Sequence, residues 1–180
     1  ALRARSFDGV GITREAYGPG ERMAHALVRE AAGEIGLEIA VDPIGNMTMT
    51  LPGSDRAAKR IVLGSHLDSV PQGGNFDGAA GVLCGLAVAA GMVRAGFTPA
   101  RDVTVMAIRA EEAGAWFPTS YPGSRGALGM LKPQDLEVRR MDSDRTLADH
   151  MREEGFDPGF ALRGERSMGP DSVAAFLELH

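Results

Sequence analysis

The chain has 180 residues, of which 44% are hydrophobic and 24% charged, proportions typical of a folded globular protein. This composition excludes a disordered tail or a fibrous repeat, and the length suits one ordinary domain. The net charge of −5 argues against a nucleic-acid partner held by basic residues. The single cysteine, Cys84, excludes an internal disulfide framework and favours a reducing, cytoplasmic location.

Neither of the two segments that bear on membrane targeting predicts a membrane span or a signal peptide. The longest apolar run, 78–93, has sixteen residues and falls short of the ~20 that a membrane span requires. It therefore predicts a helix buried in a protein core. Residues 1–5 carry no apolar stretch of the kind found in signal peptides, and the chain does not begin with methionine. Ala1 therefore need not be the natural start.

Apolar periodicity predicts the elements in chain order. Residues 20–36 repeat apolar side chains every four positions and end on a glycine, which predicts a helix. Compact or alternating apolar runs predict strands at 38–41, 46–51, 60–63 and 102–109. The helix at 78–93 separates the last two strands. This βαβ order predicts an α/β sheet flanked by helices.

Further along the chain the pattern is looser. Residues 116–129 are rich in Gly, Pro, Ser and Tyr and predict an ordered loop that leads into a short helix. Residues 146–155 predict a surface helix capped by Ser143 or Asp144. A last strand is predicted at 172–179.

His66 and Asp68 are the first group of metal-binding side chains at a predicted strand end. In an extended segment residues i and i+2 point to the same side, so Asp68 is expected beside His66. A carboxylate there accepts a proton from one ring nitrogen and leaves the other for a metal. A polar strand end with a solvated aspartate is the alternative.

Carboxylates mark two further positions. Asp77 stands at the expected start of the apolar helix, where it is either a plain N-cap, an anionic ligand favoured by the helix dipole, or both. Glu111 and Glu112 directly follow the strand at 102–109 and are costly there unless a cation compensates them. Because strand neighbours face opposite ways, one is expected to bind a metal and the other to face a metal-bound water. A solvated acidic turn is the alternative.

The combination favours a metal site. Open α/β sheets place their ligands at the carboxyl ends of the strands, where these groups fall. Together with His180 they supply nitrogen and oxygen ligands suited to zinc, manganese or cobalt. The other candidates are interpreted structurally: Cys84 as a buried thiol, and His25 and His150 as solvated side chains. No phosphate-binding glycine motif supports a nucleotide site.

Several motifs resemble those of a known family. Segments 64–71 (GSHLDSVP) and 73–78 (GGNFDG), with the Glu111-Glu112 pair, resemble the di-metal amidohydrolases and exopeptidases of the carboxypeptidase G2-like class. The resemblance is closer to the hydantoinase/carbamoylase branch, which contains N-carbamoyl-L-amino acid hydrolases, β-ureidopropionases and allantoate amidohydrolases. Further segments similar to that branch are 7–14, 45–46, 51–54, 123–125 and 177–180.

The resemblance implies a three-layer, zinc-exopeptidase-like catalytic domain with two divalent metals (zinc, or manganese, cobalt or nickel). The implied metal ligands are His66 and His180 for one ion, Glu112 for the other, and Asp77 bridging both. Asp68 would orient His66, and Glu111 would be the general base on a metal-bridged hydroxide. The implied substrate is a small N-carbamoyl or ureido-substituted amino acid, whose C–N amide bond is hydrolysed. A dipeptidase or aminoacylase of the same wider class is the alternative.

Two departures from the family pattern affect these expectations. Trp116 stands where family members usually carry arginine, which leaves the amino-acid substrate open. Family members are also more than twice as long, with a lid and dimerisation domain after the His180 region. A last histidine ligand and a substrate-binding arginine follow that domain. Residues 1–180 are therefore expected to be the N-terminal portion of a catalytic domain that is a homodimer when complete. At most one metal is expected to bind tightly here, and a catalytically inactive metal-binding fragment is a further alternative.

Overall fold

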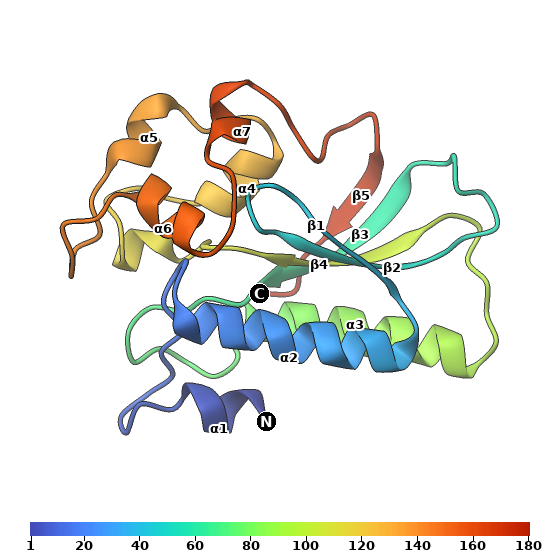
Figure 1. Cartoon of the computed structure of the whole chain (residues 1–180). Helices are drawn as coiled ribbons and strands as arrows, with labels where there is room; N and C mark the ends of the chain where they lie inside the picture. Colours follow the sequence, from blue (N-terminus) through green and yellow to red (C-terminus); the bar gives the residue numbers. More distant parts are fainter.

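The computed structural model describes the whole chain, residues 1–180, as five strands in one mixed sheet with helices around it (Figure 1). The strands are β1 (Glu38–Val41), β2 (Met47–Leu51), β3 (Arg60–His66), β4 (Val103–Ile108) and β5 (Val173–Leu177). Their order across the sheet is β1-β2-β4-β3-β5. All five predicted strands are present, and the predicted α/β fold is confirmed.

The unit β3-α3-β4 positions the site. Helix α3 (Ala79–Arg94) connects β3 to β4, which pair in parallel, and β5 pairs in parallel with β3 on the other side. Register pairs His66 with Ile108, so both strands end at the same edge. Central strands of a parallel sheet are covered on both faces, and their sequences are apolar runs. β4 is such a strand, and it is buried along its whole length.

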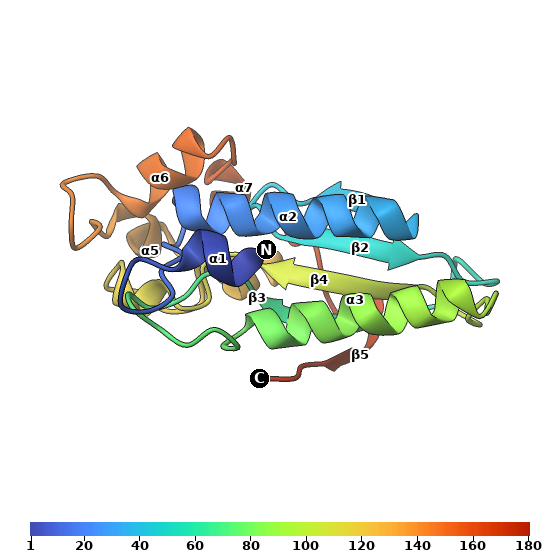
Figure 2. The same cartoon turned by 90° about the horizontal axis from the view of Figure 1, so that it is seen from below.

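Helices α2 (Pro19–Ile35) and α3 form a layer on one face of the sheet. Helix α2 lies beside α3 (Figure 2), and it ends at Gly36 in the left-handed conformation (φ 86°). Alternate β4 residues pack on opposite faces. Val105 joins the core under α2 and α3, whereas Met106 joins a small cluster with Ala127 of α4.

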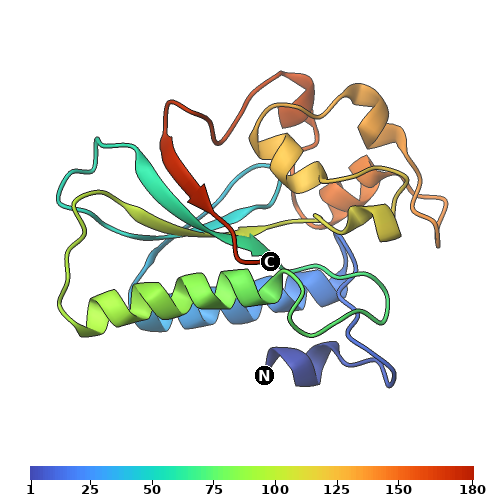
Figure 3. The same ribbon diagram turned by 180° about the vertical axis from the view of Figure 1, so that it is seen from behind.

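Short helices fill the space beyond the carboxyl end of β4 (Figure 3). They are α4 (Pro122–Ala127), α5 (Pro133–Glu137), α6 (Leu147–Glu153) and α7 (Gly159–Leu162), after a 3-10 turn at Ala113–Ala115. Helix α1 (Leu2–Ser6) packs against α2 near the N-terminus. A second core forms around Phe117, Leu147 and Met151. The segment 116–129, predicted as a loop that leads into a short helix, itself contains α4, and the next helix is α5.

Three local predictions are wrong. Helix α6 is capped by Thr146, whose Oγ1 accepts the Asp149 N–H, and not by Ser143 or Asp144. That helix is also half-buried, because Met151 and its neighbours face the second core. Helix α3 is not buried all round, since one face remains exposed and carries Cys84. No helix in the structure is both long and apolar enough to span a bilayer.

Candidate functional site

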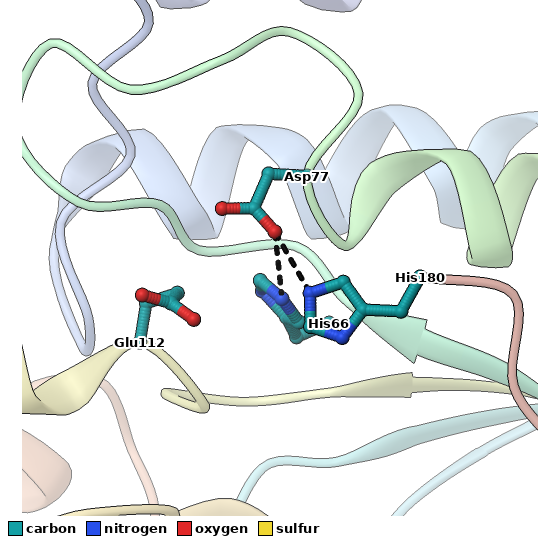
Figure 4. Close-up of side chains that lie close together, drawn as sticks. All are labelled: His66, Asp77, Glu112 and His180. Carbon is teal, nitrogen blue, oxygen red and sulfur yellow. Dashed lines mark hydrogen bonds and ion pairs between the residues drawn. The ribbon is translucent and has the colours of Figure 1, made fainter.

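Four side chains with metal-binding groups meet at the carboxyl edge of the parallel strands (Figure 4). One ligand atom from each lies within 4.8 Å of all the others; the residues are His66, Asp77, Glu112 and His180. They come from the end of β3, the loop before α3, the turn after β4 and the segment after β5. The structure thus brings together the four residues expected as metal ligands.

His66 is the last residue of β3, and its side chain is only 1% exposed. Its Nδ1 lies 3.2 Å from Asp68 Oδ1, and its Nε2 lies 3.7 Å from Asp77 Oδ1. Burial opposes protonation, but the hydrogen bond to Asp68 and the charges of Asp68 and Asp77 raise the pKa of His66 to about 9. Nε2 is buried without a hydrogen-bond partner. A buried ring nitrogen that faces a carboxylate and lacks a partner fits a metal ligand.

Asp77 does not cap α3. The N-cap is Gly78, and no side chain makes a capping bond there, so the plain N-cap interpretation of Asp77 is wrong. Its Oδ1 instead lies 2.8 Å from His180 Nε2. Gly78 has φ 63°, and a Cβ there would overlap the His66 ring. Glycine at this position therefore lets the Asp77 loop pass directly over His66.

Asp68 connects the histidine to the glutamate pair. It is fully buried, and its Oδ1 and Oδ2 accept the backbone N–H groups of Glu111 and Glu112 at 3.0 and 2.9 Å. Oδ1 also faces His66 Nδ1. Sequence reasoning identified only the contact with His66; the two bonds to the turn after β4 cross more than 40 residues and have no sequence signal.

Glu111 and Glu112 occupy a turn, because β4 ends at Ile108. Both line the same cavity, so the expectation that strand geometry points them in opposite directions is wrong. Glu111 Oε1 accepts the Ser124 N–H at 2.7 Å, which fixes this carboxylate against the start of α4. Burial raises the pKa of Glu111, opposed by its hydrogen bonds with Ser124.

His180 approaches the cluster from the segment after β5. Its side chain is 52% exposed, and its ring centroid lies 5.2 Å from that of His66 at an interplanar angle of 75°. The Ser65 hydroxyl donates to Glu178 Oε1 at 2.6 Å and ties this segment to the end of β3. The position of His180 therefore depends on β5 staying paired with β3.

The charge balance also fits a bound cation. The four carboxylates of Asp68, Asp77, Glu111 and Glu112 surround two imidazoles, and the nearest buried guanidinium is Arg14. Arg14 donates to the Leu67 and Asp77 carbonyls, and its Nη1 has no partner. Carboxylates so close together are costly unless a positive charge offsets them. A divalent cation held by oxygen and imidazole nitrogen would provide it.

A cavity of about 580 Å³ opens beside the cluster. His66, Glu111, Glu112 and His180 line one part of it, and the rest of the lining is largely apolar: Ile108, Tyr121, Leu128, Met168, Val173 and Phe176. Trp116 does not line this cavity. Its Nε1 donates to the Ser69 carbonyl at 2.8 Å, so it holds the loop after β3 that carries Asp68.

Known proteins are similar to this chain in sequence. The chain is 38% identical over 170 residues to an N-carbamoyl-L-amino acid amidohydrolase of Geobacillus stearothermophilus, which covers 94% of this chain and 41% of that protein. It is 33% identical over 175 residues to the allantoate amidohydrolase of Bacillus subtilis, with 97% and 41% covered. The chain therefore spans about two fifths of the length of these curated relatives.

Solved structures agree with the sequence relatives. A hydantoinase/carbamoylase family amidase from Burkholderia ambifaria superposes with a TM-score of 0.85 at 29% identity, over 99% of this chain and 42% of that one. The resemblance to the hydantoinase/carbamoylase branch is thus confirmed. The sequence profile of peptidase family M28 matches residues 46–141, which include His66, Asp77 and the glutamate pair. Because that match extends over more than half of the sequence and contains the ends of β3 and β4, the chain belongs to peptidase family M28.

Proposed function

We propose that this chain carries the metal-binding part of an amidohydrolase that cleaves the C–N amide bond of N-carbamoyl or ureido-substituted amino acids. The observation that carries the proposal is the convergence of His66, Asp77, Glu112 and His180 beside a cavity that Glu111 also lines. The similarity to amidohydrolases named for N-carbamoyl amino acids and allantoate supports this substrate class.

The residues suit two ions unequally. One ion would have three protein ligands: His66, Asp77 and His180. The second would have only two in this chain, Asp77 and Glu112. Bound divalent cations supply Lewis-acid polarisation of a carbonyl and lower the pKa of water. Asp68 keeps Nδ1 of His66 engaged and so leaves Nε2 for an ion.

Glu111 would act as the general base. Its carboxylate lines the cavity and is held by the Ser124 N–H, yet it is not among the four residues whose ligand atoms cluster. It would accept a proton from the attacking water and pass it to the departing nitrogen. The division of labour between the two adjacent glutamates follows from this difference in position.

The substrate class is tested by a panel of N-carbamoyl amino acids, allantoate and dipeptides, with Zn²⁺, Mn²⁺ or Co²⁺ supplied. We expect turnover of N-carbamoyl amino acids or allantoate and no cleavage of dipeptides. The panel is run on the 180-residue chain and on the longer polypeptide that the proposal requires. Cleavage of dipeptides alone would favour the second candidate, a dipeptidase or aminoacylase, which the match to a peptidase family supports. If neither form turns over any of these substrates, the remaining interpretation is that residues 1–180 are a catalytically inactive metal-binding fragment.

We further propose that residues 1–180 are the N-terminal portion of a catalytic domain whose remainder covers β5 and the outer face of α3. Coverage of only 41% of the relatives supports this. Apolar side chains are exposed where that remainder would pack: Leu83 (47%), Val88 (45%), Leu177 (57%) and Leu179 (57%).

Exposed apolar surface next to an unpaired strand edge promotes association. The isolated 180-residue chain is therefore expected to be oligomeric or poorly soluble, as measured by sedimentation velocity. Charged substitutions at Val88 and Leu177 should increase the monomer fraction, whereas a matched substitution at exposed Met141, in a loop before α6, should not. A monomeric wild-type chain with a cooperative melt would contradict the proposal.

A further inference from the structure

The turn that carries the glutamate pair is held by side chains. The backbone N–H groups of four consecutive residues, 109–112, each donate to a side-chain oxygen from another part of the chain. The acceptors in order are Asn46 Oδ1 (2.9 Å), Glu21 Oε1 (2.7 Å), Asp68 Oδ1 (3.0 Å) and Asp68 Oδ2 (2.9 Å). Asp68 already belongs to the site, but Glu21 lies on α2 and touches none of the clustered residues.

Ala110 is the residue in this turn that most needs support. It is fully buried and has φ 55°, in the left-handed region that non-glycine residues rarely adopt. A residue held there persists only when surrounding contacts fix it. Glu111 and Glu112 follow it directly, and both line the cavity. The backbone conformation of Ala110 therefore sets the direction in which the chain enters these two residues.

Glu21 supplies that support from the first turn of α2. Its side chain is fully buried; Oε1 accepts the Ala110 N–H, and Oε2 accepts the Tyr17 N–H at 2.7 Å and the Arg109 guanidinium at 3.2 Å. Both oxygens are thus acceptors for buried donors. An amide at this position would place an NH₂ donor against one of these donors, so only a carboxylate satisfies all of them.

We propose that Glu21 is a positioning residue for the reaction: by holding Ala110, it sets the placement of Glu111 and Glu112 relative to the other candidate metal ligands. The inference rests on the proposed function for its catalytic meaning, but the contact itself does not need a metal. Glu21 acts through the backbone of the turn and not on a substrate. Loss of its carboxylate should therefore disturb the turn and the ion site more than it disturbs the rest of the fold.

The test compares Glu21→Gln with Val28→Ala, a substitution of a buried residue on the same helix that packs in the core between α2, α3 and the sheet. Amide hydrogen exchange, followed without metal, should be at least about 10-fold faster at Ala110 and Glu111 in Glu21→Gln than in Val28→Ala. Co²⁺ absorption titrations should show a Kd about 10- to 100-fold weaker in Glu21→Gln, the range seen when an outer partner of a metal ligand is lost. Val28→Ala should bind Co²⁺ as the wild type does.

Equal exchange at Ala110 in the two variants, or an equal loss of Co²⁺ affinity, would overturn the proposal. If Glu21→Gln does not fold, the wild type still decides: its Ala110 amide should exchange as slowly as those of β4, and rapid exchange would show that Glu21 does not hold it. A wild type that binds no Co²⁺ but shows the exchange difference would refute the proposed function and leave the contact between Glu21 and the turn intact.

Discussion

The 180-residue chain is expected to retain one divalent cation after dialysis, and the His66→Ala variant is expected to lose it. His66, Asp77 and His180 would supply three protein ligands, enough for zinc with water completing a tetrahedron. His66 is the buried, pre-oriented member of this set. The loss of affinity should exceed about 100-fold, the upper range for losing only an outer partner of a ligand. Asp77 and Glu112 alone should not retain a second ion through dialysis.

Elemental analysis of dialysed protein measures this directly. His150→Gln is the matched control, because that histidine lies outside the cluster with its Nε2 3.3 Å from Ser143 Oγ, and its metal content should equal that of the wild type. His180 is half exposed near a chain end, so a frayed C-terminus would lower the wild-type affinity without changing the ranking of the variants. Two equivalents of tightly bound metal, or one equivalent that survives His66→Ala, would show that the ligand assignment is wrong.

The fold was predictable because its elements have strong local patterns. The apolar runs of β3 and β4 and the long helix between them define a parallel pair. Parallel pairing then brings the polar residues after both strands to one edge, which places His66 near the glutamates before any contact is known. Long segments with clear periodicity thus determined both the sheet and the approximate site.

The errors concern which face of an element is covered. Cys84 was expected to be buried, but α3 is apolar on all sides, so its sequence does not show which face meets the sheet. His25 was expected to be solvated on a helix between charged residues, yet it is 5% exposed because it packs beside Glu21 and Arg109. His150 is likewise buried, in an edge contact with the Phe117 ring. Each outcome depends on tertiary partners that no local window contains.

The support of the site was beyond sequence reasoning for the same reason. Glu21 and Ala110 are 89 positions apart, and Asn46 and Arg109 are 63 apart. Neither contact can be predicted from apolar periodicity or from a sequence motif of known structural role. Buried carboxylate or amide oxygens that accept backbone N–H groups are recognisable only when the turn they hold is seen in three dimensions. The sequence therefore predicts which candidate ligands converge better than it predicts the groups that position them.

Replacing each of the adjacent glutamates by its amide should have two different effects: Glu111→Gln should lower turnover, and Glu112→Gln should lower metal affinity. Glu111→Gln keeps an Oε1 that can accept the Ser124 N–H, so the side chain should stay in place and metal content should be unchanged. The amide cannot take a proton, and turnover by the active form of the enzyme should fall by about 10²- to 10⁴-fold or more, the usual contribution of a general base. Turnover and metal content are measured on the same samples.

Glu112→Gln is the matched control, because it changes the neighbouring residue in the same turn by the same atoms. Its carboxylate belongs to the group of four candidate metal ligands, so this variant should lose affinity for the ion, and excess metal should restore part of its activity. Excess metal should not restore Glu111→Gln. Near-wild-type turnover in Glu111→Gln would refute the role of Glu111. Metal loss in Glu111→Gln with normal metal content in Glu112→Gln would show that the roles are reversed, because Asp68 holds both backbone amides equally and only the side chains differ.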